Sequence, residues 1–221
     1  RTDAMKKMSI LILILTTLAL SGCQSEALTA DSIAWMSDEP ILFMDDFTNP
    51  SGGWKTQEDR ISFAGYTQEG FRLWVDMPNF LIWSVPGLNF KDTRIYTKAQ
   101  KTAGPENNLY GVICRYQNRQ NYYAFMISSD GYYGIYRRQA GIISRMGLTQ
   151  MGFSEAILRG NQPNEILALC QGDQLVLFVN DTKLLQVTDD TFTHGDVGLI
   201  AGNLATPGAD ILFNYFIVLK P

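Results

Sequence analysis

The sequence predicts an all-β fold in which two sheets are stacked as a sandwich. From Arg60 onward, short apolar runs alternate with turn residues at intervals of roughly eight to twelve residues, a spacing typical of β-sandwiches and barrels. Helical periodicity is absent from this part of the chain. Some runs are apolar on both faces, because Leu175, Leu177 and Val179 alternate with Val176 and Phe178. Such strands must be covered on both sides, and two stacked sheets achieve this better than one open sheet.

Composition is consistent with one β domain. The 221 residues are 46% hydrophobic and 12% aromatic, which is enough for a core of ordinary depth. All of the aromatic residues lie from Trp35 onward. We therefore expect a single β-sandwich domain over residues 41–221.

The first residues predict export from the cytoplasm. Two lysines, Lys6 and Lys7, precede the apolar run at residues 9–20, as in a secretory signal peptide. The run is too short to span a bilayer as a stable helix. We expect residues 1–22 to be the signal peptide, with residues 1–4 as a short upstream extension.

The stretch that ends this segment, Leu20-Ser21-Gly22-Cys23, resembles the lipobox of bacterial lipoproteins. The resemblance implies cleavage before Cys23 and acylation of that residue, and so a lipid anchor in the membrane. Residues 23–40 are then the lipidated cysteine and a flexible tether, since they are small and polar. The alternatives are an ordinary signal peptide or a short buried helix with a chance cysteine.

Lipidation implies a place in the bacterial cell envelope, on the extracytoplasmic side of a membrane. Removing residues 1–22 takes away three basic residues and one acidic residue, which leaves 15 Lys plus Arg against 21 Asp plus Glu and a net charge of -6. An acidic domain is a poor partner for phosphate backbones. We therefore expect no nucleic-acid partner.

Thirteen strands are predicted from the apolar runs. They cover residues 61–66, 71–77, 80–85, 93–101, 110–117, 122–128, 132–139, 142–146, 165–171, 174–180, 183–188, 197–202 and 210–219. Residues that tolerate positive φ stand between several of them, including Ser129-Asp130-Gly131, Gly172-Asp173 and Asn180-Asp181. Such residues permit tight hairpins.

The hairpin around Ser129-Asp130-Gly131 carries the candidate binding residues. With a three-residue turn and Gly131 left-handed, Ser128 faces Tyr132, and this sets the register. One face then holds core residues, namely Tyr123, Phe125, Ile127, Tyr133 and Ile135. The other face holds Tyr122, Tyr136 and Arg138, which with Arg115 from the preceding strand predict a solvent-reaching ligand surface of stacking rings and hydrogen-bonding guanidinium groups. The alternative is a tyrosine-rich sheet surface without function.

A wider pattern supports this interpretation. It comprises Asp46-Phe47, Gly52-Gly53-Trp54, Tyr110 to Gln117, Asn121-Tyr122-Tyr123, Ile127 to Tyr133, Asp173 to Asn180, Gly195 to Leu199 and Phe213 to Phe216. The pattern resembles the concanavalin A-like lectin/glucanase superfamily, and within it the 3-keto-disaccharide hydrolase-like group. The resemblance implies a jelly-roll sandwich of two curved antiparallel sheets, with the concave sheet facing the ligand. It also implies a possible calcium ion where the first strand meets the last, with Asp46 and Asp210 as candidate ligands. No other cofactor is expected.

No catalytic residues can be assigned. Glycoside hydrolysis needs two carboxylates across the scissile bond, and the Glu-x-Asp-x-x-Glu string of the glucanases does not occur. The single histidine, His194, cannot build a zinc site, and nothing else in the sequence completes a Ser-His-Asp triad.

Two cysteines, Cys114 and Cys170, remain after lipidation, each in a predicted strand. Outside the cytoplasm they predict a disulfide, and the alternative is two separate buried thiols. The sequence as a whole predicts a membrane-anchored module that binds carbohydrate or another envelope polymer without cleaving it. The alternatives are a glycoside hydrolase acting on a 3-keto or ordinary glycoside and a structural or protein-interaction domain.

Overall fold

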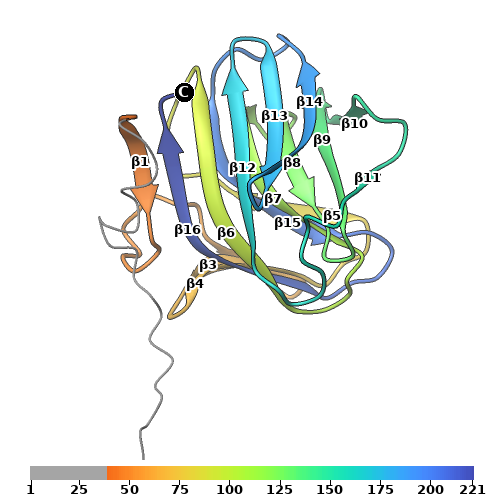
Figure 1. Ribbon diagram of the computed structural model, residues 1–221. Helices are drawn as coiled ribbons and strands as arrows, with labels where there is room; N and C mark the ends of the chain where they lie inside the picture. The colour runs from red at the N-terminus through yellow and green to blue at the C-terminus, as the bar shows by residue number, and fades with distance from the viewer. Residues whose placement is uncertain (1–38) are drawn as a thin grey trace, which may run out of the picture.

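The computed structural model describes residues 39–221, which form strands, turns and loops without a helix. The strands make two antiparallel sheets packed face to face, as the sequence predicts (Figure 1). Among these residues, no helix is long and apolar enough to cross a membrane. The predicted signal peptide, Cys23 and nearly all of the predicted tether lie outside the described residues.

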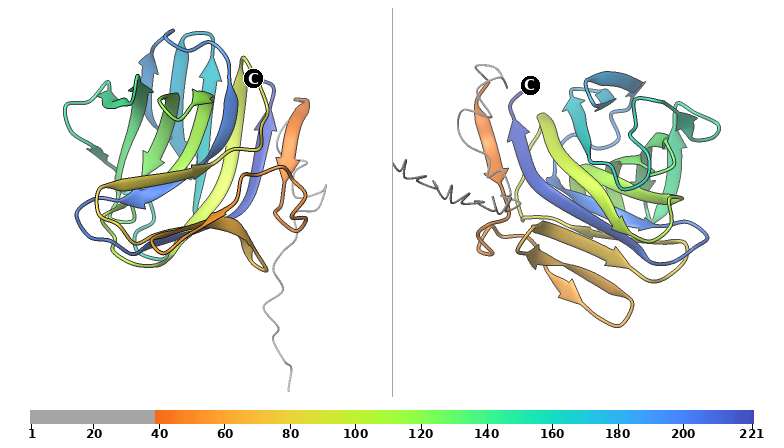
Figure 2. Two further views of the ribbon diagram at one scale, coloured as in Figure 1. Left: turned by 180° about the vertical axis from the view of Figure 1, so that it is seen from behind. Right: turned by 60° about the horizontal axis from the view of Figure 1, so that its bottom comes forward.

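Within the described residues, the larger sheet has nine strands. Its order is β14 (Thr182–Thr188), β13 (Gln174–Val179), β12 (Asn164–Gln171), β6 (Thr93–Ala103), β16 (Ala209–Leu219), β4 (Gly70–Val75), β3 (Ser62–Thr67) and β2 (Gln57–Glu58), and β1 (Ile41–Asp45) also pairs with β16. Along one side of β16, β4 pairs with the first half and β1 with the last residues. Figure 2 shows β1, in orange, beside the end of the dark blue β16.

The smaller sheet has seven strands in this part of the chain, residues 39–221. Its order is β10 (Ile142–Met146), β9 (Tyr132–Gln139), β8 (Asn121–Ile127), β7 (Asn108–Asn118), β15 (Asp196–Asn203) and β5 (Phe80–Ser84), and β11 (Gly152–Phe153) also pairs with β9. Each of the thirteen predicted strands has an observed counterpart whose ends differ by at most two residues. The sequence missed β1, β2 and β11. Two of these are only two residues long, too short to show an alternation.

The predicted turns set the registers of the hairpins. Asn180 and Asp181 have φ values of 47° and 63° and form a two-residue turn between β13 and β14, as expected where both central residues must be left-handed. In the hairpin of β8 and β9, the Ser128 amide donates to the Tyr132 carbonyl at 2.8 Å, and Gly131 has a φ of 98°. The register predicted for this hairpin is confirmed.

The main core lies between the two sheets. Phe125 and Ile135 of the smaller sheet and Phe213 and Ile95 of the larger sheet are fully buried there. Burying a side chain of this size contributes roughly 1.5 to 3 kcal/mol. The two sheets are also joined covalently, because Cys114 on β7 forms a disulfide with Cys170 on β12. The predicted bridge is therefore confirmed over the alternative of two free thiols.

A second apolar cluster covers the outer face of the seven-stranded sheet. Its fully buried members include Ile113, Ala124, Met126 and Ile200, although within residues 39–221 no third layer of strands lies over them. They are covered by large side chains of the same face and by Met151 from the connection between β10 and β11. This face carries the candidate site.

Candidate functional site

The outer aromatic face, as we name it, consists of six side chains on five strands of the smaller sheet. They are Trp83 on β5, Tyr116 on β7, Tyr122 on β8, Tyr136 and Arg138 on β9, and Arg145 on β10. The register explains their grouping, since Tyr122 lies opposite Arg138 and Tyr136 lies opposite Arg145. Residues directly opposite each other in a sheet share a face. The predicted sharing of one face by Tyr122, Tyr136 and Arg138 is confirmed.

Three rings of this face pack together. Tyr116 and Tyr122 are stacked with ring centroids 5.8 Å apart, and the Trp83 ring is 5.6 Å from Tyr122 and 6.5 Å from Tyr116. Strands β15 and β7 separate β5 from β8, so the backbones are about 14 Å apart at the usual strand spacing. The rings of Trp83 and Tyr122 therefore lean toward each other over the intervening strands, as expected where a sheet curves toward its outer side.

Two arginines lie over rings of the outer aromatic face. The Arg138 guanidinium carbon is 5.8 Å from the Trp83 ring centroid and 6.0 Å from that of Tyr122, and its Nη1 is 3.5 Å from the Tyr122 hydroxyl. Arg145 lies 5.7 Å over the Tyr136 ring and donates from Nη1 to the Thr149 carbonyl at 2.9 Å. Within residues 39–221 neither arginine has a carboxylate partner, and the buried Nε of Arg138 has no hydrogen-bond partner.

Burial divides the six side chains into two groups. Tyr122 is fully buried and Tyr136 is 7% exposed, whereas Trp83, Tyr116 and Arg138 are half-buried and Arg145 is exposed. Burial raises the pKa of Tyr122, although Arg138 acts to lower it, so this phenol stays protonated at neutral pH. The prediction that Tyr122 and Tyr136 reach solvent is wrong, because both side chains are buried. The Tyr122 ring supports the more accessible rings of Trp83 and Tyr116.

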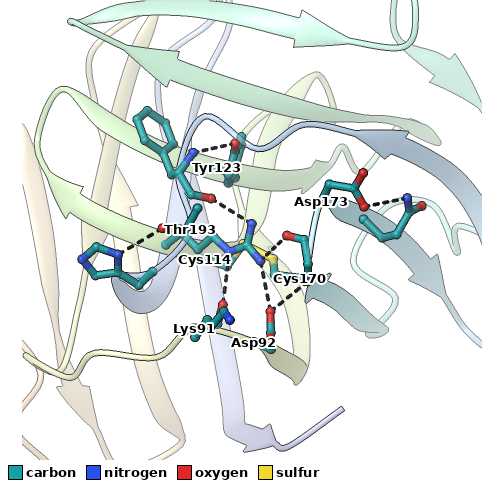
Figure 3. A network of polar contacts seen from close by, with 12 residues as sticks. Lys91, Asp92, Cys114, Tyr123, Cys170, Asp173 and Thr193 are labelled. Atoms are coloured by element: carbon teal, nitrogen blue, oxygen red, sulfur yellow. Dashed lines mark hydrogen bonds and ion pairs between the residues drawn. A yellow bond between two sulfur atoms is a disulfide. The ribbon is translucent and has the colours of Figure 1, made fainter.

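Arg115 lies away from the outer aromatic face. It is 2% exposed, and its guanidinium donates to the carbonyls of Lys91 at 3.2 Å, Phe192 at 2.8 Å and Gly172 at 2.7 Å (Figure 3). It also pairs with Asp92 at 3.3 Å. The prediction that Arg115 faces a ligand is therefore wrong, because its donors are used to join loops beside the disulfide.

A bulge in β7 explains this difference. The pairing of β7 with β8 shifts after Cys114, and Arg115 has a left-handed φ of 51°. A bulge inserts one extra residue, so the strict alternation of faces fails beyond it. Cys114 points into the core, and Tyr116 takes the outward position that alternation assigns to Arg115.

The candidate calcium ligands do not share one site. The Asp46 carboxylate accepts from the Thr48 amide at 3.0 Å and from the Thr48 hydroxyl at 2.6 Å. Asp210 is bound by two nitrogens of Arg72, and it lies six residues before Phe216, the residue that pairs with Asp45. Over residues 39–221, no group of three or more His, Cys, Asp or Glu side chains could hold a metal. The expectation of a joint calcium site at Asp46 and Asp210 does not fit this geometry.

Sequence reasoning missed three members of the site, namely Trp83, Tyr116 and Arg145. The signal for Arg145 was present, because Ala140 and Gly141 form a two-residue turn with φ values of 50° and 84° that places Arg145 opposite Tyr136. Trp83 could be assigned outward by its alternation with the buried Ile82. The contact between Trp83 and Tyr122 depends on which distant strands pair, and the alternation of apolar residues within one strand does not predict this.

Comparison with known proteins gives structural relatives only. No family model and no curated protein sequence matches the chain. The carbohydrate-binding module CBM66 from Bacillus subtilis superposes with a TM-score of 0.61 at 15% identity, covering 73% of this chain and 92% of that one. A Bacillus subtilis protein of unknown function with a galectin-like fold gives 0.61 at 10% identity, covering 82% and 97%.

Glycoside hydrolases are also among the structural relatives. A Bacteroides ovatus GH16 protein, solved in complex with a G4G4G3G product, gives a TM-score of 0.58 at 11% identity and covers 81% of this chain and 100% of that one. Identities this low establish the fold alone. Residues 39–221 thus form an all-β jelly-roll sandwich of two antiparallel sheets.

Proposed function

We propose that this protein binds carbohydrate or another polymer of the bacterial cell envelope through its outer aromatic face, without cleaving it. The observation that carries the proposal is the arrangement of Trp83, Tyr116 and Arg138. Two half-buried rings stand beside a half-buried arginine that has no carboxylate partner within the described residues.

The chemistry of the face suits a saccharide. Sugar rings present apolar C–H faces that pack on aromatic rings, and their hydroxyl groups accept hydrogen bonds from guanidinium N–H groups. Buried Tyr122 holds the rings in place, so little side-chain freedom is lost on binding. Structural relatives described as a carbohydrate-binding module and as a GH16 protein with a bound product support a glycan ligand on this fold.

The distribution of carboxylates supports binding without hydrolysis. The seven strands of the smaller sheet contain one acidic residue, Asp196. Its carboxylate accepts from the Gly87 amide at 2.8 Å and from the Val197 amide at 2.9 Å, and the side chain is buried. Burial raises the pKa of Asp196 in spite of these hydrogen bonds. A glycosidase needs a second carboxylate across the bond, and these strands supply none.

Binding to a glycan array, with a hydrolysis screen on the same glycans, tests the proposal. We expect binding without turnover, and we expect Trp83→Ala and Arg138→Gln each to weaken binding about tenfold. Two matched controls, Trp74→Ala and Arg60→Gln, should bind like the native protein. Trp74 is half-buried on a strand of the other sheet, and Arg60 is exposed between β2 and β3 of that sheet. Turnover of a bound glycan would show that the protein is a glycoside hydrolase. If all four variants bind as well as the native protein, the outer aromatic face is not the binding site.

We further propose that the domain is held in the cell envelope by a lipid on Cys23. The support is the sequence alone, namely the lysine-flanked apolar run and the lipobox-like stretch ending at Cys23. An anchored position would keep a binding domain next to envelope polymers.

A further inference from the structure

A pocket of about 220 Å³ opens on the outer face of the larger sheet, on the opposite side of the sandwich from the outer aromatic face. The strands that form it are β16, β6, β12 and β13, which lie side by side in Figure 1. Leu167 and Phe178 alternate with the core residues Ile166 and Leu177, so they point away from the smaller sheet. This sheet pocket, as we name it, is lined by residues that include Tyr96, Glu165, Leu167, Phe178, Asp181 and Tyr215.

Three aromatic residues and a leucine form the walls of the sheet pocket. Leu167 lies between Tyr96 and Phe178, because it pairs with Tyr96 on β6 and with Phe178 on β13. Residues directly opposite each other in a sheet share a face. Tyr215 comes from β16, directly after a bulge that shifts the pairing with β6. The pocket therefore has apolar walls that come from four strands.

The turn between β13 and β14 brings two carboxylates to the sheet pocket. The Asn180 amide donates to the Glu165 carbonyl at 2.9 Å, and the Glu165 amide donates to Asn180 Oδ1 at 2.8 Å. The Asn180 Nδ2 donates to the Ala156 carbonyl at 2.7 Å and to Asn164 Oδ1 at 2.8 Å. Asn180 thus fixes the turn, and Asp181, the next residue, lines the same pocket as Glu165.

These two carboxylates lack partners. Within residues 39–221, the side chains of Glu165 and Asp181 accept no hydrogen bond and form no ion pair. Burial raises the pKa of Tyr215, and the nearby charge of Glu165 adds to the rise, so this phenol stays protonated and neutral. The lining residues therefore carry two negative charges and no positive charge.

The cations on this face are engaged elsewhere or lie outside the sheet pocket. Arg94 pairs with Glu39 at 2.6 Å, and the Lys183 Nζ donates to a glutamine side chain at 3.3 Å. Lys98 lies opposite Glu165 on β6, but it does not line the pocket and forms no ion pair in the described part of the chain. The pocket thus suits a ligand that brings a positive charge of its own.

We propose that the sheet pocket binds a protonated primary amine, carried by an amino sugar or by an ethanolamine headgroup. An ammonium group has three N–H donors for carboxylate and phenol oxygens, and aromatic rings attract its charge. The apolar walls pack against the carbon atoms next to the amine, and the volume suits a ligand no larger than one sugar ring. The proposal does not rest on the proposed function, because the pocket lies on the other sheet.

Paired ligands test for the amine. The probes are glucosamine and ethanolamine, each compared with its N-acetylated form, which keeps the carbon skeleton but carries no charge. Each probe is titrated into the isotope-labelled full chain while the backbone amide signals are followed by NMR. We expect at least one amine to bind about five times more tightly than its N-acetylated form, with the largest shifts at Glu165, Asn180 and Asp181. The difference should shrink as salt is added.

The two amines also distinguish the sources of the ligand. Tighter binding of glucosamine would identify an amino sugar, and tighter binding of ethanolamine would identify a headgroup. Equal binding of each amine and its N-acetylated form, or binding of neither, would overturn the proposal. The proposed function would then still stand, because glycan binding by the outer aromatic face is measured separately.

Substitutions locate the effect. Glu165→Gln and Asp181→Asn keep the size of each side chain and remove one charge, so each should remove most of the preference for the amine. Both residues are exposed, and asparagine tolerates the left-handed φ of 63° at position 181, so both variants should fold. The matched control is Asp173→Asn, in the exposed turn at the other end of β13, which should keep the preference. An amine preference that survives both Glu165→Gln and Asp181→Asn would overturn the assignment to the sheet pocket.

Discussion

The Arg115 side chain joins three segments at one end of the sandwich. Its donors reach the carbonyl of Lys91 before β6, that of Gly172 in the turn between β12 and β13, and that of Phe192 before β15. Only arginine carries enough donors in fixed directions to serve three carbonyl groups at once. Arg115 is therefore a structural residue here.

Replacing Arg115 with Met should lower the free energy of unfolding by roughly 3 to 5 kcal/mol, because buried carbonyls and Asp92 lose their donor. Urea denaturation measures the change. Arg159→Met is the matched control and should stay within about 0.5 kcal/mol of the native protein, since Arg159 is exposed. Equal stability of the two variants would show that the Arg115 hydrogen bonds contribute little.

Asp189 should make stability depend on pH in the acidic range. Burial acts to raise its pKa, but hydrogen bonds from Tyr123 and Thr191 and the charge of Arg137 outweigh burial, so the pKa is lowered. Burial, together with the hydrogen bond to Asp189, raises the pKa of Tyr123 to about 12, so this phenol stays protonated. A carboxylate with a lowered folded-state pKa stabilises the fold above its unfolded pKa of about 4, and this contribution is lost as pH falls through the folded pKa.

Asp189→Asn should therefore be less stable than the native protein at pH 7, and the difference should shrink as the pH falls below about 4. Urea denaturation of both proteins between pH 7 and about pH 2 measures this difference. Other buried carboxylates, such as Asp45 and Asp196, are common to both proteins and cancel in the comparison. A difference that stays constant across the range would show that the charge of Asp189 is not the stabilising feature.

At the scale of elements, hairpins could be predicted from sequence and bulges could not. The turn at Ser129-Asp130-Gly131 depends on adjacent residues, so its register and the two faces of β8 and β9 follow from local rules. The bulge at Arg115 leaves no such local mark, because arginine rarely adopts a left-handed φ. Because this one bulge was not predicted, Arg115 was assigned to the outer face, where the structure has Tyr116.

The two faces of this hairpin should respond differently to truncation. Phe125→Ala opens a cavity in the core between the sheets and should cost roughly 3 to 5 kcal/mol of unfolding free energy. Arg138→Ala removes a half-buried side chain over two rings and should cost about 1 kcal/mol, while glycan binding falls. Calorimetric unfolding and glycan titration of both variants measure the contrast. If Arg138→Ala lost more unfolding free energy than Phe125→Ala, Arg138 would be a residue that mainly stabilises the fold.

At the scale of the whole molecule, the fold class was more predictable than the site. Strands that are apolar on both faces, such as β13, must be covered on both sides, which requires a second layer. This can be predicted from a single short run of apolar residues. The site depends on which strands pair. Trp83 on β5 meets Tyr122 on β8 only because β15 enters the sheet between β5 and β7, more than 70 residues after Tyr122 in the chain.

The position of the molecule in the cell depends, in our proposal, on Cys23. Two or more acyl chains, at roughly 0.8 kcal/mol for each buried methylene, hold a protein on a membrane without a spanning helix. Cys23→Ser should therefore release the protein from the membrane fraction and abolish labelling by a fatty-acid probe, while glycan binding is unchanged because the outer aromatic face lies in residues 39–221. Fractionation of bacteria that express each form measures the release. Equal distribution of native and Cys23→Ser proteins between membrane and soluble fractions would show that Cys23 carries no anchor.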